Sequence, residues 1–273
     1  MLATLLLGAT VAFAASGTPP KRTVDACFKS MRALAPKPRS LHGSADPSVL
    51  GAFSVFRKPV RPNLDISHNL DGPVSSYDPT HAGLLISNKH GQAYLVPVRL
   101  GTYPETDACK KVPDADAYFA AISDIWGSGP GVCTVSSSPD SPTDDLCTSL
   151  SRIEGYSYPA GPMFGSTTSQ LVPDGVSRVD YAFADGKVQS RSVSHNLVSR
   201  PHPPDPPKSP ATFTAAYGRA LKRWFAKALP TQIVWLNANG SVIAIHRRPH
   251  GLVTTETRMM RFASIAVASE RVK

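Results

Sequence analysis

Apolar and polar residues alternate most regularly over residues 178–183, where Val179, Tyr181 and Phe183 occupy every second position. This period of two is typical of a strand with one buried face and one face in water. The dipeptide Asp185-Gly186 follows. Between two such runs it predicts a hairpin with a type I′ turn, which requires positive φ at both central residues.

The return strand begins at Lys187 and carries Val188 and Val193 among polar residues. Positions five apart fall on opposite faces of a regular strand. The two valines therefore suggest a bulge or bend near Ser190 to Ser192 that brings them to one side.

A second hairpin is predicted over residues 232–245. Its arms, 233–236 (IVWL) and 242–245 (VIAI), flank the turn sequence Asn237-Ala238-Asn239-Gly240. Both arms are apolar on both faces, which is the composition of strands at the centre of a packed sheet. The turn also explains Asn239-Gly240-Ser241 better than a glycosylation site does.

The clearest helical pattern covers residues 211–229, after a proline-rich connector at 200–210. Ser209 is the expected cap, Pro210 suits the first turn, and Pro230 ends the pattern. The apolar stripe consists of Phe213, Tyr217, Ala220, Leu221, Trp224 and Ala228. The opposite side carries Arg219, Lys222, Arg223 and Lys227. This pattern fits both a helix packed on a core and a helix lying on a membrane surface, and its position between two strands favours packing.

Weaker patterns predict the remaining elements. Residues 21–35 have helical spacing, Asp46 can cap a helical turn that starts at Pro47, and a short helix is expected after Asp114. Strands are expected at 83–87 and 92–100, paired as a hairpin, and at 132–135. Residues 68–77 have the composition of a loop.

These elements predict a mostly β fold of antiparallel hairpins, sandwich-like, with a few helices. An α+β fold, in which the late helix covers one sheet face, is the alternative. The expected organisation is a signal peptide at 1–14, an N-terminal helical and loop region at 15–75, a disulfide-containing β-rich region at 76–170, and a β-hairpin region at 171–273 with the helix 211–229 inserted.

Residues 1–14 are expected to act as a secretory signal. They contain no charged side chain, an apolar run from Leu5 to Phe13, and the small-x-small pattern Ala12-Phe13-Ala14. The run is too short to span a bilayer. A missing Lys or Arg at the start departs from the usual pattern, and a buried N-terminal helix is the alternative.

All four cysteines follow the expected cleavage point, and an even number in an exported chain favours disulfides over a metal site. Four cysteines allow three pairings. We favour Cys133 with Cys147, which flank a polar loop, and this choice leaves Cys27 for Cys109.

The net charge of +9 suits contact with anionic cell-wall polymers or lipid headgroups, although it also serves solubility alone. The candidate contacts with such a surface are Arg219, Lys222, Arg223 and Lys227. We do not expect a nucleic-acid partner, and no later segment is long and apolar enough to suggest a transmembrane helix.

Several short stretches resemble a group of secreted actinobacterial proteins without an established activity. They are GAFSVFRKP (51–59), AYLVPV (93–98), GVCTV (131–135), VPDGVSRVDYAFADGKV (172–188) with His195-Asn196, and IVWLNANGSVI (233–243). The resemblance implies export, a β-rich fold and a disulfide between Cys133 and Cys147. The chain departs from the pattern between Cys109 and Cys133 and in its proline-rich connector and basic helix.

No motif assigns chemistry to the chain. His246 and His250 have helical metal-ligand spacing, but Pro249 and the preceding strand argue against a helix there. The group Asp65, His68 and Asp71 lies in a loop-like segment, and the sequence contains neither a Gly-x-Ser-x-Gly elbow nor a glycine-rich phosphate loop. We therefore assign no catalytic, cofactor-binding or metal-ligating residue.

Three hypotheses about function remain. The first is a secreted, disulfide-bonded binding or structural module without catalysis. The second is a cell-envelope protein that binds anionic polymer or lipid through the basic helix, and the third is an extracellular hydrolase whose site assembles only in the folded chain.

Overall fold

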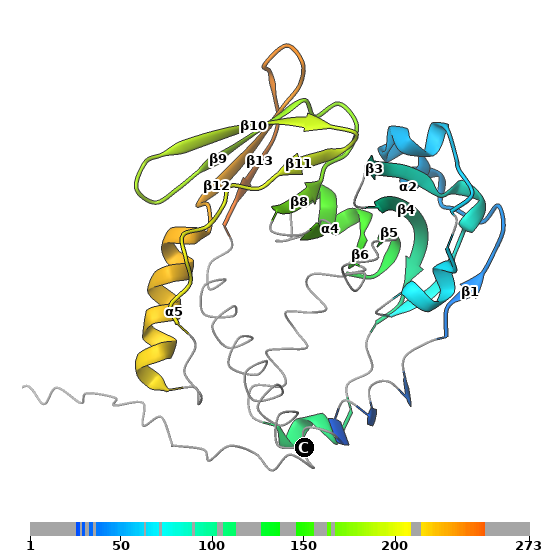
Figure 1. Cartoon of the computed structure of the whole chain (residues 1–273), viewed down its shortest axis with the longest axis horizontal. Coiled ribbons are helices and arrows are strands. Elements are labelled where there is room, and N and C mark those ends of the chain that lie inside the picture. Colours follow the sequence, from blue (N-terminus) through cyan, green and yellow to red (C-terminus); the bar gives the residue numbers. More distant parts are fainter. Residues whose placement is uncertain are drawn as a thin grey trace, which may run out of the picture.

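The computed structural model describes residues 37–62, 64–70, 73–88, 91–102, 106–112, 127–136, 146–155, 163–164, 167–208 and 214–248, with the short pieces 26–27, 29–30 and 33–34. Within these residues the strands form two sheets, of six and seven strands (Figure 1). The helices are few: α2 (Pro47–Ala52), α4 (Leu150–Glu154) and α5 (Ala215–Ala228). The predicted mostly β fold with a few helices is thus confirmed.

The first sheet has the order β1-β2-β4-β5-β6, with β3 paired to β4. Its strands are β1 (Arg39–Ser40), β2 (Val74–Tyr77), β3 (Gly83–Asn88), β4 (Gly91–Leu100), β5 (Gly129–Ser136) and β6 (Leu146–Ser149). The predicted hairpin is β3 and β4, and β5 contains the predicted strand at 132–135. Part of the stretch expected to be a loop is strand β2, because Val74 is buried and pairs with Leu100.

Strand β4 is buried on both faces. Tyr94 and Val96 belong to a cluster that also contains Cys133 and Cys147, whereas Leu95 belongs to a second cluster on the other side of the sheet. A strand covered on both faces loses the alternation of apolar and polar residues, which explains the nearly continuous apolar sequence of β4.

The second sheet has the order β13-β12-β9-β10-β11-β8-β7. Its strands are β7 (Met163–Phe164), β8 (Thr167–Leu171), β9 (Arg178–Ala182), β10 (Val188–Ser194), β11 (Leu197–Ser199), β12 (Gln232–Leu236) and β13 (Val242–Arg247). The alternation predicted for β9 is confirmed: Val179 and Tyr181 are fully buried and pack with Ile233 and Trp235 of β12.

The hairpin of β9 and β10 exists, but two details predicted for it are wrong. Its pairing is regular from Val188 opposite Ala182 to Ser192 opposite Arg178. The predicted bulge is not needed, because Val188 is exposed and only Val193 packs against the core. Of the two turn residues only Gly186 has positive φ, at 81°, and its N–H donates to the carbonyl of Phe183. The turn is therefore the three-residue kind, a type I turn followed by a left-handed glycine.

Strand β13 lies at the edge of its sheet, not at the centre as its apolar sequence predicts. Val242, Ile243 and Ile245 are 56%, 47% and 54% exposed, whereas Ile233 and Trp235 of the neighbouring β12 are buried. The predicted turn between the two strands is confirmed, since Asn237 accepts hydrogen bonds from the N–H groups of Asn239 and Ser241.

Helix α5 begins at Ala215, later than residue 211. Its cap is Thr214, not Ser209, because the hydroxyl of Thr214 accepts the N–H of Tyr217. The helix ends at Ala228, before Pro230 as predicted. It extends away from the second sheet rather than across one of its faces (Figure 1), so the predicted covering role of this helix is wrong, whereas two sheets with a few helices also fit a β-rich α+β class.

The other local predictions have mixed outcomes. Asp46 caps α2 through the N–H of Ser48, as expected. The described residues within 21–35 are helical. The predicted signal segment at 1–14 and the helix after Asp114 lie outside the described residues. In the part of the chain that the structure describes, no helix is both long and apolar enough to cross a membrane.

Two disulfides hold distant segments together. Cys27 pairs with Cys109, and Cys133 pairs with Cys147 across neighbouring positions of β5 and β6. This is the pairing favoured from the sequence. The first closes a sequence separation of 82 residues and the second a separation of 14.

Candidate functional site

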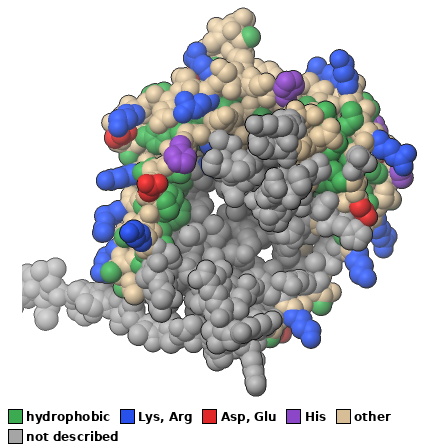
Figure 2. Space-filling view, in the orientation of Figure 1, with side chains coloured by type: hydrophobic (Ala, Val, Ile, Leu, Met, Phe, Trp, Pro, Cys, Tyr) green, Lys and Arg blue, Asp and Glu red, His purple; other side chains and the backbone are tan. Residues whose placement is uncertain are grey.

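The basic side of α5 is the candidate site. Arg219, Lys222, Arg223 and Lys227 are all exposed. At 3.6 residues per turn, the four positions fall within about 140° of the helix circumference. Figure 2 shows Lys and Arg side chains gathered along the side of the molecule where Figure 1 places this helix.

The opposite side of α5 is occupied by the protein itself. Leu221, Phe225 and Leu229 are buried in one cluster, against which Tyr217 and Trp224 pack. The apolar stripe predicted from the sequence does not include Phe225. In the structure Phe225 is buried, whereas Trp224, which the prediction includes, is only partly buried.

Two polar contacts fix the orientation of the helix. The indole N–H of Trp224 donates to the carbonyl of Pro204 at 2.8 Å, which ties the helix to the proline-rich connector. The guanidinium of Arg248, just beyond β13, donates to the carbonyls of Ala226 and Leu229 at 3.2 and 3.1 Å. These contacts tie α5 to the connector and to the end of β13, while the four basic side chains remain exposed.

The four cations have no salt-bridge partner in the part of the chain that the structure describes. Helix α5 itself contains no Asp or Glu. Arg219, Arg223 and Lys227 are spaced i, i+4, i+8, and like charges at i, i+4 destabilise a helix by about 0.2 to 0.5 kcal/mol per pair. This i, i+4 repulsion costs stability.

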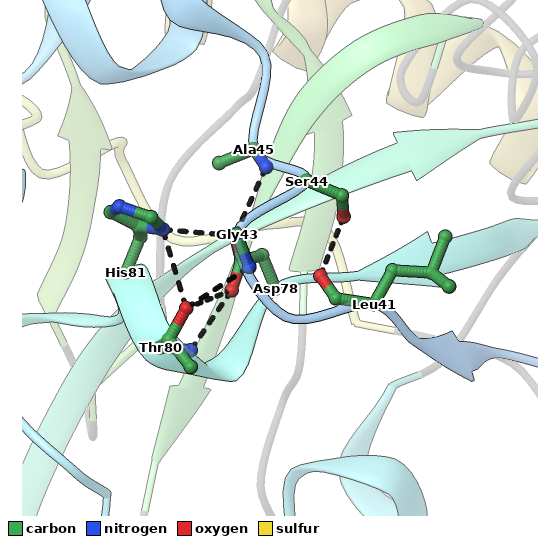
Figure 3. Close-up of polar contacts among 7 residues, drawn as sticks. All are labelled: Leu41, Gly43, Ser44, Ala45, Asp78, Thr80 and His81. Carbon is green, nitrogen blue, oxygen red and sulfur yellow. Dashed lines mark hydrogen bonds and ion pairs between the residues drawn. The ribbon is translucent and has the colours of Figure 1, made fainter.

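A second polar cluster surrounds Asp78, which is only 1% exposed (Figure 3). Its carboxylate accepts hydrogen bonds from the N–H groups of Ala45 and Thr80, each at 3.0 Å, and from the hydroxyl of Thr80. The Nδ1 of His81 lies 2.9 Å from the same carboxylate. Asp78 thus joins the loop before α2 to the short 3-10 helix η3 (Pro79–His81).

The pKa of Asp78 reflects these contacts. Burial raises the pKa, but hydrogen bonds from Thr80, His81 and the backbone N–H groups of Ala45 and Thr80 outweigh burial and lower it to about 2. The carboxylate is therefore ionised at neutral pH.

A histidine whose Nδ1 is held by a buried carboxylate resembles half of a catalytic triad. In the described residues, however, the hydrogen bonds of His81 reach only Asp78 and Thr80, through Nδ1. The cluster closes on itself as a capped turn, since Asp78 is the N-cap of η3. We interpret it as structural.

A third polar cluster joins the 3-10 helix η1 (Ser54–Arg57), which follows α2, to two turns of the second sheet. Asp174 accepts from the N–H of Ser54 at 2.8 Å, from the side chain of Asn196 at 2.9 Å and from Arg57 at 2.6 Å. The side-chain oxygen of Asn196 in turn accepts the hydroxyl of Ser54. This cluster brings together GAFSVFRKP, PDGV and His195-Asn196, which are far apart in the sequence.

Among the described residues, the histidines do not converge on a metal site. His246 lies against the ring of Trp235, with the ring centres 4.4 Å apart, and burial lowers its pKa although a hydrogen bond to the backbone of Gly155 opposes the shift. His195 is exposed in a turn, and Asp65 caps the 3-10 helix η2 (Ile66–Asn69). His250 and Asp71 lie outside the described residues. Among those residues, no group of three or more His, Cys, Asp or Glu could hold a metal ion.

The chain was also compared with known proteins. No model of a known protein family, no curated protein and no solved structure matches it.

Proposed function

We propose that this protein is a non-catalytic binding module that acts outside the cytoplasm and contacts an anionic partner through the basic side of α5. The observation that carries the proposal is the row of exposed cations at Arg219, Arg223 and Lys227, with Lys222 beside it, none of which pairs with an acidic residue among the described residues. Such a row repels itself, and an anionic partner would remove the repulsion.

The two disulfides support a place outside the cytoplasm, because disulfides persist mainly in oxidising compartments. The apolar run of residues 1–14 supports export by a cleaved signal. Amino-terminal sequencing of protein collected from the medium tests this part of the proposal, with Ala15 as the expected first residue.

The binding itself is tested with two anionic probes, poly(glycerol phosphate) and phosphatidylglycerol vesicles. The variant Arg219→Gln/Arg223→Gln/Lys227→Gln should bind the preferred probe on the order of 100-fold more weakly at low salt, because it removes three cations that each contribute about 1 kcal/mol near an anionic surface.

A matched control removes the same charge elsewhere. Lys58, Arg61 and Arg247 are exposed on other elements. The variant Lys58→Gln/Arg61→Gln/Arg247→Gln should keep most of the binding. Equal losses in the two triple variants would mean that net charge alone acts, and unchanged binding in both would overturn the proposal.

A further inference from the structure

The side of α5 that a membrane-binding helix would insert is already used inside the protein. Helices that lie on a bilayer bury an apolar face at the boundary of headgroups and acyl chains. In α5 this face is packed away, with Leu221 1% and Phe225 7% exposed. Trp224, the residue best suited to anchor at such a boundary, donates its indole N–H to Pro204.

The outward side offers cations in a line. Along an α-helix, Arg219, Arg223 and Lys227 advance by about 6 Å per step, or about 12 Å in all, and turn by only about 80°. An extended chain of anionic groups can follow such a line and meet each cation in turn. Two of the three are arginines, whose planar guanidinium matches two oxygens of one phosphate.

The same side carries no aromatic residue. The aromatic residues of α5 are Tyr217, Trp224 and Phe225, and all three pack on the buried side. Proteins that hold single-stranded nucleic acid usually stack its bases on exposed aromatic side chains. The basic side of α5 is therefore suited to a charged backbone and not to bases.

From these three observations we infer that the partner of α5 is a linear phosphodiester polymer that is recognised through its backbone charges and not through bases, rather than a lipid bilayer. This inference rests on the proposed function and specifies the chemical class of the partner.

The experiment measures the affinity of the protein without residues 1–14 for three anionic probes. They are poly(glycerol phosphate), an oligothymidylate and phosphatidylglycerol vesicles. Fluorescence anisotropy measures the two polymers, and sedimentation measures the vesicles. The two polymers should bind with affinities within about threefold of each other. In a plot of log affinity against log salt concentration, the slope should be smaller in magnitude by about 2 for the Arg219→Gln/Arg223→Gln/Lys227→Gln variant, as expected for the loss of three phosphate contacts.

The tryptophan emission is the second readout. Because Trp224 remains against Pro204, vesicles should not shift its emission to shorter wavelength. The variant Trp224→Phe identifies this signal among those of the three tryptophans.

The outcomes separate the two proposals. Tighter binding to vesicles with a blue shift that depends on Trp224 would overturn the polymer inference and leave the proposed function intact. Much tighter binding to oligothymidylate than to poly(glycerol phosphate) would identify a nucleic-acid partner and would also overturn the inference. Binding to none of the three probes, or binding unaffected by the triple variant, would overturn the proposed function itself.

Discussion

At the scale of single residues, Asn196 connects segments that are far apart in the sequence. It is buried in a left-handed conformation, with φ of 61°, in a two-residue turn with His195, whose φ is 51°. Its side chain donates to the carbonyl of Val172 and to Asp174, and accepts from Ser54. Asparagine suits this position because it tolerates positive φ and supplies both a donor and an acceptor.

Two substitutions separate these roles. Asn196→Gly keeps the left-handed backbone and loses the side-chain hydrogen bonds, which should cost about 1 to 3 kcal/mol of unfolding free energy. Asn196→Ala adds the left-handed strain of about 1 to 2 kcal/mol. Urea denaturation should therefore rank the wild type above Gly and Gly above Ala. An alanine variant as stable as the wild type would show that the cluster contributes nothing.

Asp78 should control stability in acid. Its pKa is about 2 in the folded protein and 3.8 in its ordinary state, so the unfolded chain binds the proton more tightly. The resulting stabilisation is fully present above pH 4 and is lost as the pH falls through 2, and it amounts to about 2 kcal/mol. In denaturation curves from pH 5 to pH 2, Asp78→Asn should be less stable than the wild type at pH 5 and should lose less stability on acidification.

Asp185 is the control for this experiment. Its pKa is also lowered, by hydrogen bonds from Lys187, but it lies exposed in the turn between β9 and β10. Asp185→Asn should follow the wild-type curve closely. If it flattened the curve as much as Asp78→Asn does, burial of Asp78 would not be the cause.

At the scale of elements, α5 combines a buried side and a basic side whose roles are separable by mutation. Leu221 is 1% exposed, so Leu221→Ala should cost about 2 to 4 kcal/mol. Arg223→Ala, two residues away on the opposite, exposed side, should change stability by less than about 0.5 kcal/mol. Thermal or urea denaturation measures both, and similar effects of the two substitutions would contradict the assigned orientation of the helix.

Glycine has a specific role where β5 meets β6. A Cβ atom at Gly131 would lie close to the carbonyl oxygen of Thr148 and 2.8 Å from the Cα of Ser149. These are backbone atoms of the paired strand, which cannot move aside without opening the ladder beside the disulfide of Cys133 and Cys147. The small residue therefore permits the close approach of the two strands.

At the scale of the whole molecule, the two disulfides should differ in their effect on stability. In the chain-entropy model, a longer closed loop restricts the unfolded chain more. Cys27→Ser/Cys109→Ser opens a separation of 82 residues and should cost about 4.5 kcal/mol, whereas Cys133→Ser/Cys147→Ser opens 14 residues and should cost about 3 kcal/mol.

Urea denaturation of the two double variants, each compared with the wild type under oxidising conditions, measures this difference. A larger loss on opening the short loop would show that strand packing around Cys133 and Cys147, both of which are fully buried, outweighs the entropy of loop closure.

The sequence by itself determined the local features of this protein. The alternation over β9, the turn at Asn237 to Gly240, the cap of α2 at Asp46 and the two sides of α5 all follow from preferences that act within a few residues. The mostly β class follows from the same features, because hairpins with apolar faces must pack into sheets.

Only the tertiary structure decided which apolar residues are covered. The sequences of β12 and β13 are similarly apolar, yet Trp235 is buried and Ile245 is exposed, because Trp235 lies opposite Ala244 on the covered face of the sheet whereas Ile245 lies opposite Val234 on the other face. The burial of Asp78 and the meeting of Ser54, Asp174 and Asn196 likewise depend on segments far apart in the chain. A sequence records the preference of each residue for burial or for a turn, but the partner that satisfies it is fixed only when distant segments pack together.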